Sequence, residues 1–228
     1  MKLFKAVFLV LLMISVNAQG AKWQKLKSLK EYPASAYTLK EGVEYLEIRN
    51  YIKGNKDKRY NIKKYGVTVS MQSTPLKSFS PKMVKKFKAL SPNLSKQTNI
   101  KASSFCLMSG CVSQISNGFM IDSHGKMWRM NTTEDIIDML GKIDTPAEAK
   151  LVLWLNNKNR STSDEDHKDK YRKTSNGYTV ISEYENSIMN FGECGHFTYR
   201  ININKKGKIT GKKLLKKKPS KNGCLAMD

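Results

Sequence analysis

A capped helix followed by short alternating segments is the strongest signal for the fold of this chain. Thr145 and Glu148 form a capping box around Pro146, which predicts a helix through residues 151–155. Apolar and polar residues then alternate, and Gly207 predicts a turn into a last short strand. The predicted strands are 178–184, 197–204 and 208–210. This order predicts an α+β fold, in which antiparallel sheets carry short helices packed on one face.

The rest of the chain has weaker signals of the same kind. Ser80 followed by Pro81 predicts a helix start, and Thr132 or Thr133 predicts another before residues 136–140. A hairpin is predicted at residues 118–130, with Asp122-Ser123-His124-Gly125 at its turn. Other strands are predicted at 45–52, 59–65 and 67–71, and a short amphipathic turn or helix at 22–30.

In outline, the C-terminal half resembles the cystatin-like or PepSY-like arrangement of small exported bacterial domains. The residues that carry the resemblance are a helix followed by 199–204 and 207–209. The resemblance implies a helix packed on an antiparallel sheet. It implies no activity, because one such fold hosts many functions.

Residues 1–18 have the pattern of a secretory signal peptide. Lys2 and Lys5 precede an apolar run at 6–14, and Val16-Asn17-Ala18 supplies the small residue that cleavage requires. The apolar run is far shorter than the roughly twenty residues of a membrane-spanning helix. We therefore expect cleavage near Ala18, a secreted or periplasmic product, and no transmembrane segment in the mature chain.

The mature chain is predicted to have two structured regions. Residues 19–91 form a basic N-terminal α+β region, and 103–228 form a C-terminal α+β domain with a lysine-rich tail. Residues 92–102 are polar and lack periodicity, which is typical of a linker or long loop.

Four cysteines in an exported chain predict disulfide bonds. Three pairings are possible, and we expect Cys106 with Cys111 and Cys194 with Cys224, because each pair brackets one coherent segment. The second bond closes the longer loop and would tie the lysine-rich tail to the domain.

The formal net charge of +22 is distributed unevenly. Residues 19–118 hold 19 Lys and Arg against 5 Asp and Glu, whereas 119–204 hold 11 against 13. The tail, 205–221, holds nine lysines and no acid. Most of the cations are lysine, which reads base edges less well than arginine, so the composition argues against sequence-specific nucleic-acid binding. Anionic lipid, polysaccharide or another exported protein are the expected partners, and a role in solubility alone is the alternative.

The candidate anion-binding residues are lysines interleaved with aromatic residues at 59–65, and lysines of the C-terminal tail. A lysine-fringed edge strand that resists aggregation explains the same pattern. The candidates are Lys63, Lys64, Lys212, Lys213, Lys216, Lys217 and Lys218.

Catalytic and metal sites have less support. A thiol nucleophile would pair Cys106, Cys111 or Cys194 with His124 or His196, but export favours disulfides instead. Asp164-Glu165-Asp166-His167 lacks the ligand spacing and the glycine of a calcium loop, and is typical of a solvated loop. We therefore assign no catalytic, cofactor-binding or metal-binding residue.

The composition and motifs favour an exported, non-catalytic binding or accessory module that contacts anionic envelope or extracellular polymers. One alternative is a hydrolase or thiol enzyme whose site is assembled from residues far apart in the sequence. Another is an inhibitor or structural module that recognises a second exported protein.

Overall fold

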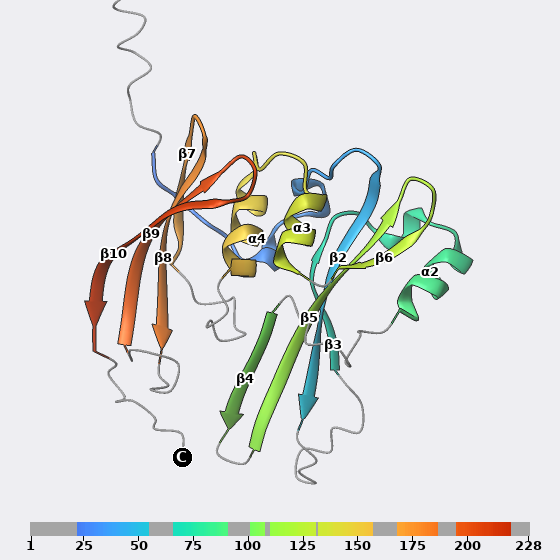
Figure 1. Ribbon diagram of the computed structural model, residues 1–228, viewed down its shortest axis with the longest axis horizontal. Coiled ribbons are helices and arrows are strands. Elements are labelled where there is room, and N and C mark those ends of the chain that lie inside the picture. Colours follow the sequence, from blue (N-terminus) through green and yellow to red (C-terminus); the bar gives the residue numbers. More distant parts are fainter. Residues whose placement is uncertain are drawn as a thin grey trace, which may run out of the picture.

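The computed structural model describes residues 22–54, 66–90, 101–107, 110–130, 132–156, 168–186 and 195–219. These parts of the chain form two antiparallel sheets and three α-helices (Figure 1), which confirms the predicted α+β class. The predicted signal segment, the strand expected at 59–65 and the acidic segment 164–167 lie outside the described residues.

The first sheet, called sheet 1 below, has the strand order β1-β7-β8-β9-β10. Its strands are β1 (Gln24–Lys25), β7 (Lys170–Thr174), β8 (Gly177–Asn186), β9 (Gly195–Asn204) and β10 (Ile209–Lys218). Strands predicted at 178–184 and 197–204 are confirmed, whereas the last strand runs much further than 208–210. The lysines expected in a tail therefore form an edge strand, because β10 pairs with β9 along its length.

The second sheet, sheet 2, has the order β3-β2-β5-β4, and β6 also pairs with β5. Its strands are β2 (Val43–Gly54), β3 (Gly66–Gln72), β4 (Lys101–Leu107), β5 (Gly110–Asp122) and β6 (Met127–Met130). Because β2 pairs directly with β5, strands from both sides of the 92–102 segment share one sheet. Residues 101 and 102 of that segment belong to β4, and the others lie outside the described residues.

The helices and sheets are arranged in layers (Figure 1). Helices α3 (Thr133–Met139) and α4 (Pro146–Asn156) lie between the sheets, and their side chains form one core with residues of both. Helix α2 (Pro81–Lys88) covers the other face of sheet 2, where Phe87 packs with Tyr45 and Phe119. Sheet 2 thus has helices on both faces, whereas one face was expected. No helix in the described ranges has the length and apolar character needed to cross a membrane.

The predicted capping box at the start of α4 is confirmed. The Thr145 hydroxyl accepts a hydrogen bond from the Glu148 N–H at 3.2 Å, and the Glu148 carboxylate accepts one from the Thr145 N–H at 3.0 Å. The other carboxylate oxygen of Glu148 accepts a hydrogen bond from the Thr38 N–H at 2.6 Å. Glu148 is fully buried, so this carboxylate both caps α4 and fixes the segment before β2.

A buried ion pair joins α4 to sheet 1. Lys150 Nζ lies 3.1 Å from Asp169 Oδ2, and the two side chains are 1% and 0% exposed. The other carboxylate oxygen of Asp169 accepts a hydrogen bond from the Glu183 N–H of β8. The backbone carbonyl of Asp169 accepts one from the Leu26 N–H. Asp169 therefore ties together the segments around β1, β7 and β8.

A second buried network joins α2 to sheet 2. Arg49 donates to the Phe87 and Leu90 carbonyls at the end of α2, at 3.1 and 2.9 Å. Its guanidinium carbon lies 4.7 Å from the Phe87 ring centroid and 4.3 Å from that of Phe119. Glu47 accepts hydrogen bonds from Arg49 Nε and from the Tyr45 hydroxyl. Burial, and then the hydrogen bond to Glu47, raise the pKa of Tyr45, so the phenol stays protonated.

The predicted hairpin at 118–130 is also confirmed. Gly125 has φ +72°, the left-handed conformation that this turn position requires. Asp122 accepts hydrogen bonds from the His124 and Lys126 N–H groups at 3.0 and 2.9 Å and from Trp128 Nε1 at 2.8 Å. The Trp128 hydrogen bond is the main cause of a lowered pKa at Asp122.

Asp122→Asn is expected to lower the urea midpoint at pH 7. A carboxylate with a lowered pKa stabilises the fold above the ordinary carboxyl pKa, and that contribution is lost as the pH falls through the lowered value. The difference from wild type should therefore shrink below about pH 4. Urea titrations at pH 7 and pH 3 measure this, with exposed Asp138→Asn as the control. An equal difference at both pH values would contradict the assignment.

One local prediction differs from the structure. Residues 22–30 were expected to form an amphipathic turn or helix, but Gln24–Lys25 is strand β1, and a 3₁₀ turn follows at Leu29–Glu31. Leu26 and Leu29 are nevertheless buried. Pairing with the free edge of β7 outweighs the weak local helical preference.

Candidate functional site

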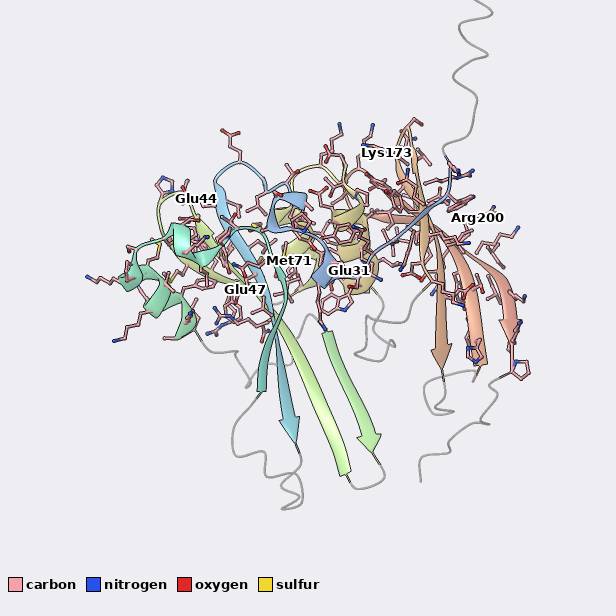
Figure 2. All side chains as sticks on the ribbon, turned by 180° about the vertical axis from the view of Figure 1, so that it is seen from behind. Glu31, Glu44, Glu47, Met71, Lys173 and Arg200 are labelled. Carbon is pink, nitrogen blue, oxygen red and sulfur yellow. The ribbon has the colours of Figure 1, made fainter. Side chains whose placement is uncertain are left out.

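The face of sheet 1 that points away from the helices is the best candidate site. Along its strands, alternate residues such as Tyr178, Val180, Ile201 and Ile203 are buried in the core. The intervening residues must therefore point to the opposite face, and Figure 2 shows Arg200 there. We call this the outer face of sheet 1.

One row of directly opposed residues crosses all five strands of this sheet. Its register joins Lys25 to Lys170, Lys170 to Ile181, Ile181 to Arg200, and Arg200 to Lys213. The four cationic residues are exposed, and Ile181 is partly buried. We call Lys25, Lys170, Arg200 and Lys213 the cationic row.

The cationic row is electrostatically unfavourable in the free protein. Lys25 faces Lys170 directly, and Arg200 faces Lys213, and like charges at opposed positions destabilise a sheet. With strands about 4.8 Å apart, the row spans about 19 Å. An extended anion lying across the strands would neutralise several of these charges at once.

Other residues on the outer face strengthen its charge. Three more cationic residues are register partners of residues that face outward. Lys216 pairs with Thr198, Lys218 with His196, and Arg172 with Thr179. The Arg172 guanidinium lies 5.1 Å from the Trp23 ring centroid, so an aromatic ring borders the face beside β1. Among the side chains described on these strands, Glu183 is the acid that shares this face.

The predicted anion-binding lysines divide between two faces of β10. Lys213, Lys216 and Lys218 have register positions on the outer face. Lys212 and Lys217 point to the inner face, where their Nζ atoms lie 4.3 Å from the Tyr199 ring centroid and 6.0 Å from that of Phe197. Lys63 and Lys64 lie outside the described residues.

A second basic surface lies around α2, at the other end of the molecule from β10 (Figure 1). It consists of the exposed lysines on and before that helix, which are Lys77, Lys82, Lys85, Lys86 and Lys88. The lysines around α2 and the cationic row thus form two separate surfaces.

The catalytic candidates are not brought together in the described residues. His124 is exposed in the β5–β6 turn, and His196 lies on β9 opposite Lys218. Cys106 and Cys111 are register partners on β4 and β5, and Cys194 and Cys224 lie outside the described residues. No group of three or more His, Cys, Asp or Glu residues in the described ranges is placed to hold a metal ion.

Sequence reasoning missed Lys25, Lys170 and Arg200. Strand alternation alone would have predicted that the Arg200 side chain points to one face of the sheet and those of Tyr199 and Ile201 to the other. The sequence contains no signal for the register that aligns it with lysines from distant strands.

Comparison of the chain with protein-family models, with curated proteins and with solved structures found no match.

Proposed function

We propose that this protein is a non-catalytic module that binds a linear polyanion across the outer face of sheet 1. The observation that carries the proposal is the cationic row, in which two like-charged pairs stand directly opposite each other. Such pairs reduce stability unless an anion lies between or above them. Lysine and arginine contacts to a polyanion also release its counterions, which favours binding at low salt.

The proposed setting is outside the cytoplasm, where an acidic polysaccharide or another envelope or extracellular polyanion would be the partner. The signal pattern at residues 1–18 supports this setting. The register that places Cys106 opposite Cys111 supports the first expected disulfide, because opposed strand residues have the Cα spacing that a disulfide needs. The pairing of Cys194 with Cys224 stays a prediction.

We also keep the cystatin-like or PepSY-like outline of the C-terminal half as part of this proposal. Its support is the order of α4 followed by the antiparallel strands β7 to β10, with α4 on the inner face of their sheet. In this arrangement the helix supports the sheet from one side and leaves the cationic face open to a ligand.

Neutralising the cationic row is expected to weaken polyanion binding. In the triple variant Lys170→Gln, Arg200→Gln and Lys213→Gln, the affinity for heparin, used as a model polyanion, should fall about tenfold or more at low salt. The slope of log K against log salt should shrink by about 2 to 3, because three charge contacts are removed. Binding measured by calorimetry across a range of NaCl concentrations gives both quantities.

The matched control removes the same charge elsewhere. In the triple variant Lys40→Gln, Lys82→Gln and Lys86→Gln, three exposed lysines outside sheet 1 are neutralised. The control should keep most of the wild-type affinity and salt slope. Equal losses in the two triple variants would show that net charge alone governs binding and would overturn the proposal.

A further inference from the structure

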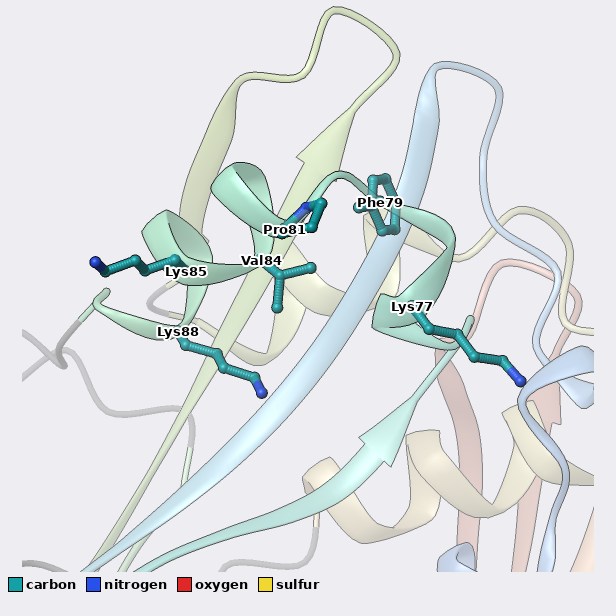
Figure 3. A pocket seen from close by; sticks show the side chains of 6 residues that line it. All are labelled: Lys77, Phe79, Pro81, Val84, Lys85 and Lys88. Atoms are coloured by element: carbon teal, nitrogen blue, oxygen red, sulfur yellow. The ribbon is translucent and has the colours of Figure 1, made fainter.

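A groove at the end of the molecule away from sheet 1 is lined by both apolar and basic residues. It lies beside α2 and the 3₁₀ turn Leu76–Ser78, and has a volume of about 570 Å³ (Figure 3). Its lining consists of Lys77, Phe79, Pro81, Val84, Lys85 and Lys88. The groove is largely open to solvent.

One face of α2 is turned to this groove. Pro81, Val84, Lys85 and Lys88 follow the i, i+3, i+4, i+7 spacing that places residues on one side of a helix. Met83 and Phe87 lie on a second side and pack in the core with Tyr45 and Phe119. Lys82 and Lys86 lie on a third side and do not line the groove. The helix therefore offers two lysines at the groove and two that are removed from it.

The lining combines apolar surface with positive charge. Phe79, Pro81 and Val84 supply the apolar part, and Phe79 is held in place by an edge contact with the Tyr45 ring at 5.8 Å between centroids. Lys77, Lys85 and Lys88 supply three ammonium groups, and no acidic residue is among the lining residues. Such a site is complementary to a ligand with an anionic head and an apolar body.

We propose that this groove binds a single-chain anionic amphiphile, such as an alkyl phosphate, with its head among the lysines and its chain against Phe79, Pro81 and Val84. The charged head pairs with a lysine ammonium group at the edge of the groove, and the chain buries apolar surface that is otherwise in contact with water. A polymer is a poorer fit, because its repeated charges would meet the apolar part of the lining. This site is independent of the polyanion site on sheet 1.

Calorimetry with three probes tests the chemistry of the site. Dodecyl phosphate, used below its micellar concentration, should bind at least tenfold more tightly than inorganic phosphate, which has no chain. It should also bind at least tenfold more tightly than dodecyl maltoside, which has the same chain and a neutral head. Equal binding of dodecyl phosphate and either partial probe would overturn the proposal.

Paired lysine variants locate the site. Lys85→Gln with Lys88→Gln should weaken dodecyl phosphate binding about fivefold, because two partly exposed charge contacts are lost. Lys82→Gln with Lys86→Gln removes the same charge from the same helix and should change binding less than twofold. Val84→Asp should abolish binding by placing a carboxylate in the apolar part. Equal effects of the two lysine pairs would overturn the placement.

Heparin binding should be unchanged in the Lys85 and Lys88 variant, which separates this test from that of the polyanion site.

Discussion

Asp169→Ala is expected to lower the free energy of unfolding by about 3–5 kcal/mol, because it leaves the Lys150 ammonium buried without its carboxylate. The substitution also removes the acceptor for the Glu183 N–H. Urea denaturation followed by far-UV circular dichroism measures the loss. Asp138→Ala, at an exposed position on α3, is the control and should change stability by no more than about 0.5 kcal/mol.

A double variant distinguishes a buried charge from a simple loss of packing. In Lys150→Met with Asp169→Leu, both charges are replaced by apolar groups, so the cost should be well below the sum of the single costs. Additive losses would contradict the ion-pair account. Because the Asp169 carboxylate joins the start of β7, which carries Lys170, to α4 and β8, Asp169→Ala should also weaken heparin binding although Asp169 itself is buried.

Arg49→Met is expected to lower the free energy of unfolding by about 3–5 kcal/mol and to loosen α2 from sheet 2. The substitution leaves the Glu47 carboxylate buried without its cation, and the Phe87 and Leu90 carbonyls lose their donor. Urea denaturation measures the global cost, and hydrogen exchange of the α2 amides measures the local one.

Two variants make the Arg49 prediction specific. Arg129→Met removes an exposed arginine from β6 of the same sheet and should have little effect. Arg49→Lys keeps the charge but cannot reproduce the planar fork, so it should recover only part of the lost stability. Unchanged exchange of the α2 amides in Arg49→Met would contradict the role of Arg49 in fixing that helix. If α2 loosens as expected, dodecyl phosphate binding should fall as well.

The elements predicted correctly from the sequence are those with strong local signals. The start of α4 has a capping box, α2 has Ser80 before proline, and the β5–β6 turn has Asp122 and Gly125 at fixed positions. Each signal is a hydrogen bond or a backbone conformation within a few residues, so it acts wherever the segment lies in the fold.

The elements that were missed depend on their partners. Residues 170–174 and 212–218 are rich in lysine and carry no clear strand pattern, yet they form β7 and the greater part of β10. They are extended because β8 and β9 offer them a free edge. Similarly, residues 24–25 join sheet 1 although the local spacing suggested a helix.

The α+β class, the helix starts, the main hairpin and the uneven distribution of charge could be predicted from the sequence, because all of these depend on neighbours in the chain. Which charges share a face depends instead on how the strands pair. The lysines of β10 alternate between two sides of a sheet, and the cationic row combines residues from four strands whose register no local pattern records. Strand pairing joins residues that are distant in sequence, and a shift of one position would turn each side chain to the opposite face.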